Sequence, residues 1–351
     1  MAFSSLARPM TSTRAPDATL PADAEDTISA VSWSPAANHL AAASWDGKVR
    51  VYDVASSGSA NGVAMLTAGG PLLSCDWAKD GKMVLAGGAD KTSHLLDCQS
   101  GQQITVGSHD APIRSVRFVD VPNSAGPIIA SGSWDKTIKF WDIRQQNPAA
   151  TLTCLERVYA MDSKAQLLVV GTAGCKIHLV DLSNPTAFAR TLDSPLKNQT
   201  RAVAAFPDGK GWATTSIEGR CGINTVEEKD TTGINFTFRC HRSQPDSDKV
   251  TKVYTVNDVQ FHPVYHTTFS TVGSDGTFHF WDRAAHARLK GFPDVGGSIT
   301  TSAFNRDGTL FAYAVGYDWS KGHSSNTPQY PNKLMLHAVA DEDVKPKSMK
   351  K

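Results

Sequence analysis

The sequence has few of the features that mark specialised protein classes. Its six cysteines lie far apart and form no C-x-x-C pair, which argues against a zinc site and a dense disulfide framework. No apolar run reaches the roughly 18–20 residues that span a bilayer, so no membrane insertion is expected. With 35 Lys+Arg against 34 Asp+Glu the net charge is +1, and any basic binding site must be a local patch.

Signatures of catalysis and of dedicated nucleic-acid reading are also missing. The chain has no G-x-S-x-G, G-x-x-x-x-G-K-[ST], H-E-x-x-H or EF-hand pattern, and no helix-turn-helix, RRM or zinc-finger pattern. His262 and His266 are four residues apart, but Pro263 between them prevents the helix that would place both on one face. We therefore expect no enzymatic activity, no cofactor and no metal, and a function in surface recognition.

The two ends of the chain differ in composition from the rest. Residues 1–20 contain Arg8 and Arg14 and no acid before Asp17, a composition typical of a mitochondrial transit peptide. Because Pro9 and Pro16 interrupt the helix that such a signal needs, we favour a disordered polar tail over residues 1–16. Residues 341–351 (DEDVKPKSMKK) are predicted to form a charged, solvated C-terminal tail.

Internal repeats dominate the remainder of the sequence. Several segments share small residues, a tight turn, an alternating strand, and an aromatic or aliphatic residue before Asp: 43–54, 88–98, 131–143, 171–182 and 273–283. From Asp53 through Asp97 and Asp142 to Asp181, the terminal aspartates are 44, 45 and 39 residues apart. These spacings match the roughly 40–45 residues of a WD-repeat blade.

Weaker copies at 212–226 and 310–339 raise the number of repeats to seven. Four short antiparallel strands per repeat, stacked around an axis, predict an all-β, seven-bladed WD40 β-propeller over residues 17–340. Residues 17–20 (DATL) are expected to close the ring as the last strand of the final blade, which hides both sheet edges. The long interval from Gly219 to Asp275, 56 residues, places extra chain in surface loops at 227–233 and 243–252.

A possible catalytic constellation occurs in the third repeat, where a histidine, a serine and an aspartate accompany a tryptophan. Its members are His109, Ser133, Asp135 and Trp141. In WD-repeat blades such a group forms a hydrogen-bond chain to the indole and satisfies polar groups that the blade buries. We favour this structural role, because a catalytic triad would also need an exposed nucleophile and an oxyanion hole.

Two arginines in the fifth repeat exceed what the repeat itself requires. Arg220 follows a Glu-Gly turn, and Arg239 belongs to the outer strand NFTFRCHR at 235–242, in which Phe238 and Arg239 point to opposite sides. The turn and the end of the outer strand lie at the same face of a blade, so the two guanidiniums should converge. They could pair with carboxylates of a partner. The alternative is a solvated pair or salt bridges within the blade, which contribute little.

A second basic group follows Trp281, and with Phe238 it could form an aromatic and basic strip for a nucleic-acid strand. Its members are Arg283, His286, Arg288 and Lys290, with the acidic Asp282 opposing them. From these residues alone, an ordinary charged loop is the favoured interpretation.

Several stretches carry a resemblance to a known family: SGSWDKTIKFWD at 131–142, IEGRCG at 217–222, FRCHR at 238–242, and AVGYDWSKGH at 314–323. The sequence resembles the WD-repeat mRNA export factors of the nuclear pore, the Rae/Gle family, whose propellers dock on the GLEBS motif of an FG-nucleoporin. The resemblance implies that Arg220 and Arg239 receive GLEBS glutamates. It also implies that Phe238, Trp281, Arg283, His286 and Arg288 match a side groove implicated in RNA contact. His286 stands where an arginine would be expected, which makes the charge there dependent on pH.

The expected function is therefore that of a non-enzymatic adaptor in nuclear mRNA export, which binds an FG-nucleoporin GLEBS motif and contacts single-stranded RNA. The expected location is the nucleus, at the nuclear pore complex and nuclear envelope, with some cytoplasmic pool. Three alternatives remain open. They are a spindle-checkpoint propeller that binds GLEBS-like motifs of checkpoint kinases, a generic WD-repeat scaffold, and a propeller hydrolase. The segment at 314–323 favours the export factor over the checkpoint propeller.

Overall fold

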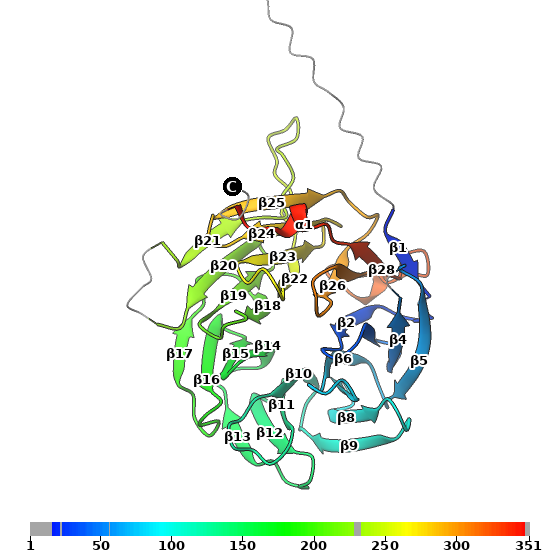
Figure 1. Cartoon of the computed structure of the whole chain (residues 1–351). Helices are drawn as coiled ribbons and strands as arrows, with labels where there is room; N and C mark the ends of the chain where they lie inside the picture. The colour runs from blue at the N-terminus through cyan, green and yellow to red at the C-terminus, as the bar shows by residue number, and fades with distance from the viewer. Residues whose placement is uncertain (1–15, 22, 56, 228–232, 348–351) are drawn as a thin grey trace, which may run out of the picture.

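The computed structural model describes residues 16–21, 23–55, 57–227 and 233–347. These residues form seven four-stranded antiparallel sheets, arranged as blades around a central axis (Figure 1). This arrangement confirms the predicted seven-bladed β-propeller. Within the described residues, no helix is long and apolar enough to cross a membrane.

The strands of the first four blades run outward from the axis in chain order. Blade one comprises β2 (Ile28–Trp33), β3 (His39–Ser44), β4 (Lys48–Val54) and β5 (Ala60–Thr67). Blade two comprises β6 (Leu72–Trp77), β7 (Met83–Gly88), β8 (Thr92–Asp97) and β9 (Gln103–Ser108). Blade three comprises β10 (Ile113–Val119), β11 (Ile128–Ser133), β12 (Thr137–Asp142) and β13 (Ala150–Thr153). Blade four comprises β14 (Val158–Lys164), β15 (Leu167–Thr172), β16 (Lys176–Asp181) and β17 (Arg190–Asp193).

The last three blades include the site predicted from the sequence. Blade five comprises β18 (Thr200–Ala205), β19 (Gly211–Ser216), β20 (Arg220–Thr225) and β21 (Phe236–Arg239). Blade six comprises β22 (Val256–Phe261), β23 (Thr268–Gly273), β24 (Phe278–Asp282) and β25 (Ala287–Phe292). Blade seven comprises β26 (Ile299–Phe304), β27 (Leu310–Val315), β28 (Lys333–Ala338) and β1 (Ala18–Leu20), with a 3-10 helix, η1 (His323–Ser325), before β28.

The N-terminal strand closes the ring, as the sequence predicts. β1 pairs antiparallel with β28, with Ala18 opposite Leu336 and Leu20 opposite Leu334. Leu20 is 2 % exposed and belongs to a core that blades one and seven share. The first and last parts of the propeller are therefore joined by both backbone pairing and apolar contact. The predicted disordered tail, apart from Pro16, lies outside the described residues.

The hydrogen-bond chain of blade three forms, but one of its members differs from the prediction. His109 bonds through Nδ1 to Asp135 (2.9 Å) and through Nε2 to the hydroxyl of Ser131 (2.7 Å). The indole of Trp141 donates to the same hydroxyl at 2.7 Å. The linking serine is thus Ser131, whereas the hydroxyl of Ser133 donates to backbone carbonyls of the preceding loop. Both serines share a face of β11, but Ser133 ends the strand and Ser131 lies level with the buried rings.

The C-terminal segment differs from the solvated tail that its charges suggest. A short helix, α1 (Asp341–Val344), packs against β24 and β25. Val344 is 2 % and Asp343 is 3 % exposed, and the hydroxyl of Thr268 donates to the Val344 carbonyl at 2.6 Å. The expectation of a solvated end is therefore wrong for these two residues. Residues 348–351 lie outside the described residues.

Candidate functional site

The two arginines singled out from the sequence lie directly opposite each other at one end of blade five. Arg220 begins β20, Arg239 ends β21, and their Cα atoms are partners in the ladder between the two strands. Arg239 is exposed, and Arg220 is half-buried. We call the side of the disc that carries this pair the Arg220 face. Like charges directly opposite in a sheet are destabilising, so the pair is a local electrostatic strain that an anionic partner would relieve.

An acidic residue of the chain already approaches one of the two arginines. The Glu218 carboxylate lies 3.5 Å from Nε of Arg220 and 3.7 Å from Nη2 of Arg242. The Asn198 amide also donates to this carboxylate. Arg239 has no such partner: within the described part of the chain, its guanidinium makes no hydrogen bond or ion pair. Arg239 is therefore the freer cation of the pair, and Glu218 would compete with an incoming carboxylate at Arg220.

The turn that presents Arg220 is fixed by its backbone. Gly219 has a φ of 59°, and a Cβ there would lie 2.7 Å from the Cys240 carbonyl oxygen. The Arg242 guanidinium donates to the Glu218 carbonyl at 2.8 Å, and the Cys240 N–H donates to the Gly219 carbonyl at 3.0 Å. Arg242 thus holds the turn in place. Arg242 stands in the FRCHR stretch at 238–242, but this role was not predicted from the sequence.

Aromatic side chains line the edge between blades five and six. The ring centres of Phe238 and Trp281 are 4.7 Å apart, and those of Phe236 and His286 are 4.0 Å apart. His286 and Arg288 are exposed, and Arg288 is the ladder partner of Trp281. The structure therefore brings Phe238, Trp281, His286 and Arg288 to one edge, which we call the aromatic edge. Phe236 belongs to it as well, although the sequence analysis did not assign it to the groove.

Two of the predicted groove residues do not belong to this edge. Asp282 is 1 % exposed, and its carboxylate accepts hydrogen bonds from the backbone N–H groups of Ala284 and Lys347. Arg283 is half-buried, with its guanidinium 4.2 Å from the centre of the Phe206 ring. Alternation along β24 places Asp282 on the opposite face from Trp281, toward the C-terminal segment. Arg283 follows the end of the strand, and its guanidinium packs on Phe206 of blade five instead.

Blade six contains a second hydrogen-bond chain, which was not predicted from the sequence. His241 bonds to Asp275 through Nδ1 (2.8 Å) and to the hydroxyl of Thr271 through Nε2 (2.9 Å). The indole of Trp281 donates to that hydroxyl at 2.9 Å. Trp281 therefore has its polar atom bound inside the blade and offers only its ring to the aromatic edge.

A signal for this second chain is present in the sequence. Asp275 precedes Trp281 by the same six residues that separate Asp135 from Trp141. His241 lies 34 residues before its aspartate, whereas His109 lies 26 before. The longer spacing arises because the loop at 243–252 follows His241, and this loop conceals the match.

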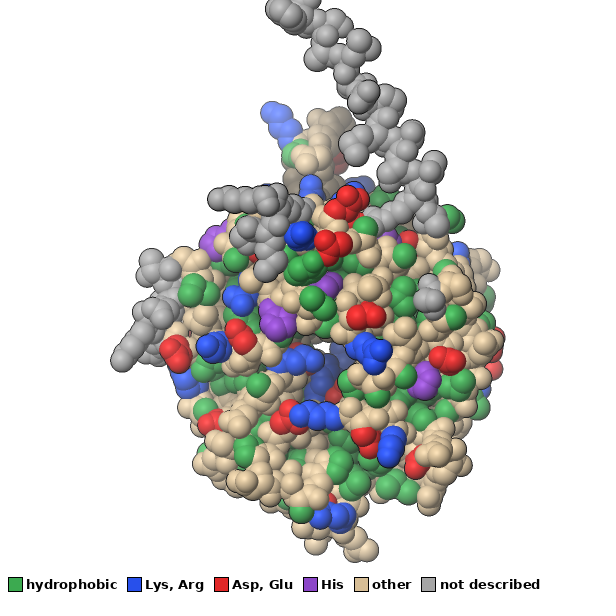
Figure 2. Space-filling model, in the orientation of Figure 1, with side chains coloured by type: hydrophobic (Ala, Val, Ile, Leu, Met, Phe, Trp, Pro, Cys, Tyr) green, Lys and Arg blue, Asp and Glu red, His purple; other side chains and the backbone are tan. Residues whose placement is uncertain are grey.

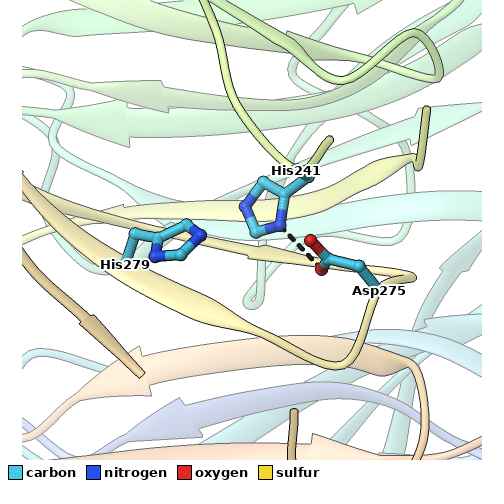
Figure 3. Close-up of side chains that lie close together, drawn as sticks. All are labelled: His241, Asp275 and His279. Atoms are coloured by element: carbon cyan, nitrogen blue, oxygen red, sulfur yellow. Dashed lines mark hydrogen bonds and ion pairs between the residues drawn. The ribbon is translucent and has the colours of Figure 1, made fainter. Parts of the chain in front are cut away.

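His241, Asp275 and His279 also lie close enough together to be considered as metal ligands (Figure 3). Both nitrogens of His241 already make hydrogen bonds, and a metal ion would have to displace one of them. Burial, together with the charges of His241 and Arg288, lowers the pKa of His279 to about 4. A nearby guanidinium opposes a bound cation as well. We therefore interpret the cluster as part of the blade's internal hydrogen bonding.

Comparisons with known proteins agree with the repeats. The family model "WD domain, G-beta repeat" matches residues 15–53, 58–97 and 101–142. The chain is 51 % identical over 340 residues to "mRNA export factor GLE2" of Chaetomium thermophilum, covering 95 % of this chain and 94 % of that protein. It is 50 % identical over 326 residues to the "Poly(A)+ RNA export protein" of Schizosaccharomyces pombe, covering 93 % and 91 %. It is also 52 % identical over 335 residues to "WD40 repeat protein poxJ" of Penicillium oxalicum, covering 95 % and 96 %.

Proposed function

Because this chain belongs to the family of WD-repeat mRNA export factors, we propose that it is a non-enzymatic adaptor at the nuclear pore. In this proposal the Arg220 face binds the GLEBS motif of an FG-nucleoporin, and the aromatic edge contacts single-stranded RNA. The protein would reside mainly at the nuclear pore complex and nuclear envelope, with a cytoplasmic pool.

The observation that carries the peptide site is the opposed pair of arginines. Arg220 and Arg239 are ladder partners, and among the described residues a carboxylate forms an ion pair with Arg220 but not with Arg239. Glutamates of a peptide would neutralise the unpaired guanidinium and form charge-assisted, bidentate hydrogen bonds. A peptide laid across the Arg220 face could reach both side chains from one direction.

The RNA contact is supported by the kinds of side chain at the aromatic edge. Rings of Phe238 and Trp281 offer surfaces on which bases can stack, and Arg288 offers a charge for phosphate. The exposed His286 lies against Phe236, with the ring centres 4.0 Å apart, and adds a further ring to this edge. Stacking and phosphate contacts give binding with little sequence preference.

The peptide site can be tested by calorimetric titration of the full chain with a GLEBS peptide from an FG-nucleoporin. We expect Arg239→Glu to weaken binding by about tenfold to a hundredfold, since a hydrogen bond to a charged group contributes roughly 1.5–3 kcal/mol. Arg220→Glu should weaken it less, because Glu218 already screens that site. Arg306→Glu, at an exposed arginine of blade seven, is the matched control and should bind as the unaltered protein does.

The same titration with a GLEBS-like peptide from a checkpoint kinase separates the proposal from its main alternative. Tighter binding of the kinase peptide would transfer the protein to the checkpoint role. Binding of neither peptide would favour a generic scaffold, and unchanged affinity in both arginine variants would remove the proposed site.

The RNA contact gives a separate prediction. Arg288→Glu is expected to weaken binding of a single-stranded oligoribonucleotide and to reduce the slope of log affinity against log salt by about one. Fluorescence anisotropy at several salt concentrations measures both. Arg306→Glu again serves as the control, and an unchanged salt slope in Arg288→Glu would count against the aromatic edge.

A further inference from the structure

The inner strand of every blade carries a register shift at the same place, one residue after the strand begins. In blades one to three the shifts fall between Ile28 and Ala30, Leu72 and Ser74, and Ile113 and Ser115. The other four blades repeat the pattern. A β-bulge changes the direction in which the side chain of its extra residue points. The residues at these positions, which we call the bulge ring, are Ser29, Leu73, Arg114, Tyr159, Arg201, Asn257 and Thr300.

Three small polar members of the bulge ring connect neighbouring blades. The Ser29 hydroxyl donates to the Leu72 carbonyl at 2.6 Å, and the Thr300 hydroxyl donates to the Ile28 carbonyl at 2.7 Å. The Asn257 amide donates to the Ile299 carbonyl at 2.8 Å. A serine, threonine or asparagine in the bulge ring can therefore link two blades by a hydrogen bond from its own side chain.

The two arginines of the bulge ring have far more donors than this use requires. Arg114 donates from Nη1 to the Leu73 carbonyl at 3.1 Å, and Arg201 donates from Nε to the Asn257 side-chain oxygen at 3.3 Å. Each guanidinium has five N–H donors. Among the residues that the structure describes, neither guanidinium forms an ion pair. Most of their donors are thus left to the solvent of the channel.

The carboxylates near these arginines are already bound elsewhere. Asp258 accepts from the backbone N–H groups of Ser302 (2.9 Å) and Val259 (2.8 Å). Asp318 accepts from the Ser320 N–H at 3.1 Å and from the Ser274 hydroxyl. These acids moderate the charge of the two arginines at a distance but do not occupy their donors.

The two guanidiniums remain charged and repel each other at neutral pH. Burial, together with the charges of Arg201 and Arg117, lowers the pKa of Arg114 to about 10. Burial also lowers the pKa of Arg201. The third arginine of the channel differs, since Nε of Arg117 lies 3.2 Å from the Asp162 carboxylate. Among the described residues, Arg114 and Arg201 thus have no carboxylate in ion-pair contact, whereas Asp258, which lines the same cavity, attracts both at longer range.

Six of the seven bulge-ring residues, all but Tyr159, line one cavity of about 80 Å³ in the channel. A single water needs roughly 10–15 Å³ of such volume, so the cavity has room for several waters or one small anion. Figure 2 shows basic side chains around the central opening of the disc and further inside it. We propose that Arg114 and Arg201 form a binding site for a phosphate-class oxyanion in the central channel. This site is separate from the peptide site and does not depend on it.

The proposal is tested by thermal unfolding and calorimetry of the full chain in inorganic phosphate, compared with chloride at equal ionic strength. Phosphate is expected to raise the unfolding temperature above its value in chloride, as a ligand of the folded state does. Arg114→Gln and Arg201→Gln should each weaken phosphate binding about tenfold or more. Without phosphate, both should unfold at the same temperature as the unaltered protein or higher, because each removes a repelling charge.

Controls separate the channel from other basic sites. Arg239→Gln removes a cation of the Arg220 face and should leave the phosphate response intact. Arg114→Lys keeps the positive charge but loses the planar guanidinium that can bind an oxyanion through two donors, so it should bind phosphate weakly. This variant also tests the site if a glutamine variant does not fold. Equal stabilisation by phosphate and chloride would overturn the proposal. So would an unchanged phosphate response in the Arg114 and Arg201 variants.

Discussion

Replacing Leu20 by Asp is expected to lower the free energy of unfolding by about 4 kcal/mol or more. Leu20 is 2 % exposed and packs in the core shared by blades one and seven. The substitution removes a buried leucine side chain, which costs about 2–5 kcal/mol, and places a carboxylate in an apolar environment. Because β1 holds the two ends of the propeller together, the damage should weaken the whole ring.

The neighbouring Thr19 provides a matched control for this prediction. Thr19 belongs to the same strand but is exposed, so Thr19→Asp introduces the same carboxylate on the opposite side of the sheet. Its effect should stay within roughly 0.5 kcal/mol, as for most surface substitutions. Urea unfolding followed by tryptophan fluorescence measures both variants. Similar stabilities for Leu20→Asp and Thr19→Asp would show that β1 does not close the ring in solution.

The fold was predictable because its determinants are local and repeated. Aspartate turns recur about every 45 residues, as from Asp97 to Asp142, and alternating strands flank them. The closing strand followed from the need to cover two sheet edges. The C-terminal helix was not predictable in this way. Val344 is a single apolar residue among charges, and its burial depends on contact with the distant strands β24 and β25.

The sequence indicated where the residues of the candidate site lie in the fold, but it did not indicate which side chains of the protein they contact. Alternation along β21 was enough to separate Phe238 from Arg239, and the blade geometry placed Arg239 beside Arg220. The approach of Glu218 to Arg220 depends on side-chain positions that spacing does not determine. The bulge ring was missed for a related reason: a bulge is a property of two paired strands, so the direction of Arg114 follows from its register with β11.

Acidification between pH 7 and pH 5 is expected to destabilise the protein through histidines that are buried in their neutral form. Burial lowers the pKa of His262 to about 4 and, with the charges of His241 and Arg288, that of His279 to about 4. In the unfolded chain a histidine titrates near 6.5. Below about pH 6.5, each of these histidines binds a proton in the unfolded chain but stays neutral in the folded protein until the pH approaches 4. Stability is therefore lost as the pH falls, by about 2 kcal/mol per histidine at pH 5.

The contribution of one histidine can be isolated with a variant and a close neighbour. His262 is 2 % exposed, and its ring accepts from the Val264 and Tyr265 N–H groups. In His262→Gln the loss of stability between pH 7 and pH 5, measured by urea unfolding, should be smaller by about 2 kcal/mol. The difference between two pH values remains informative even if the variant is less stable at both. His266→Gln, at an exposed histidine four residues away, should retain most of the loss, because burial is the largest cause of the lowered pKa of His262 and the charge of His266 is a lesser one. An equal loss in the His262 and His266 variants would mean that His262 takes up its proton without unfolding, so that burial does not keep it neutral.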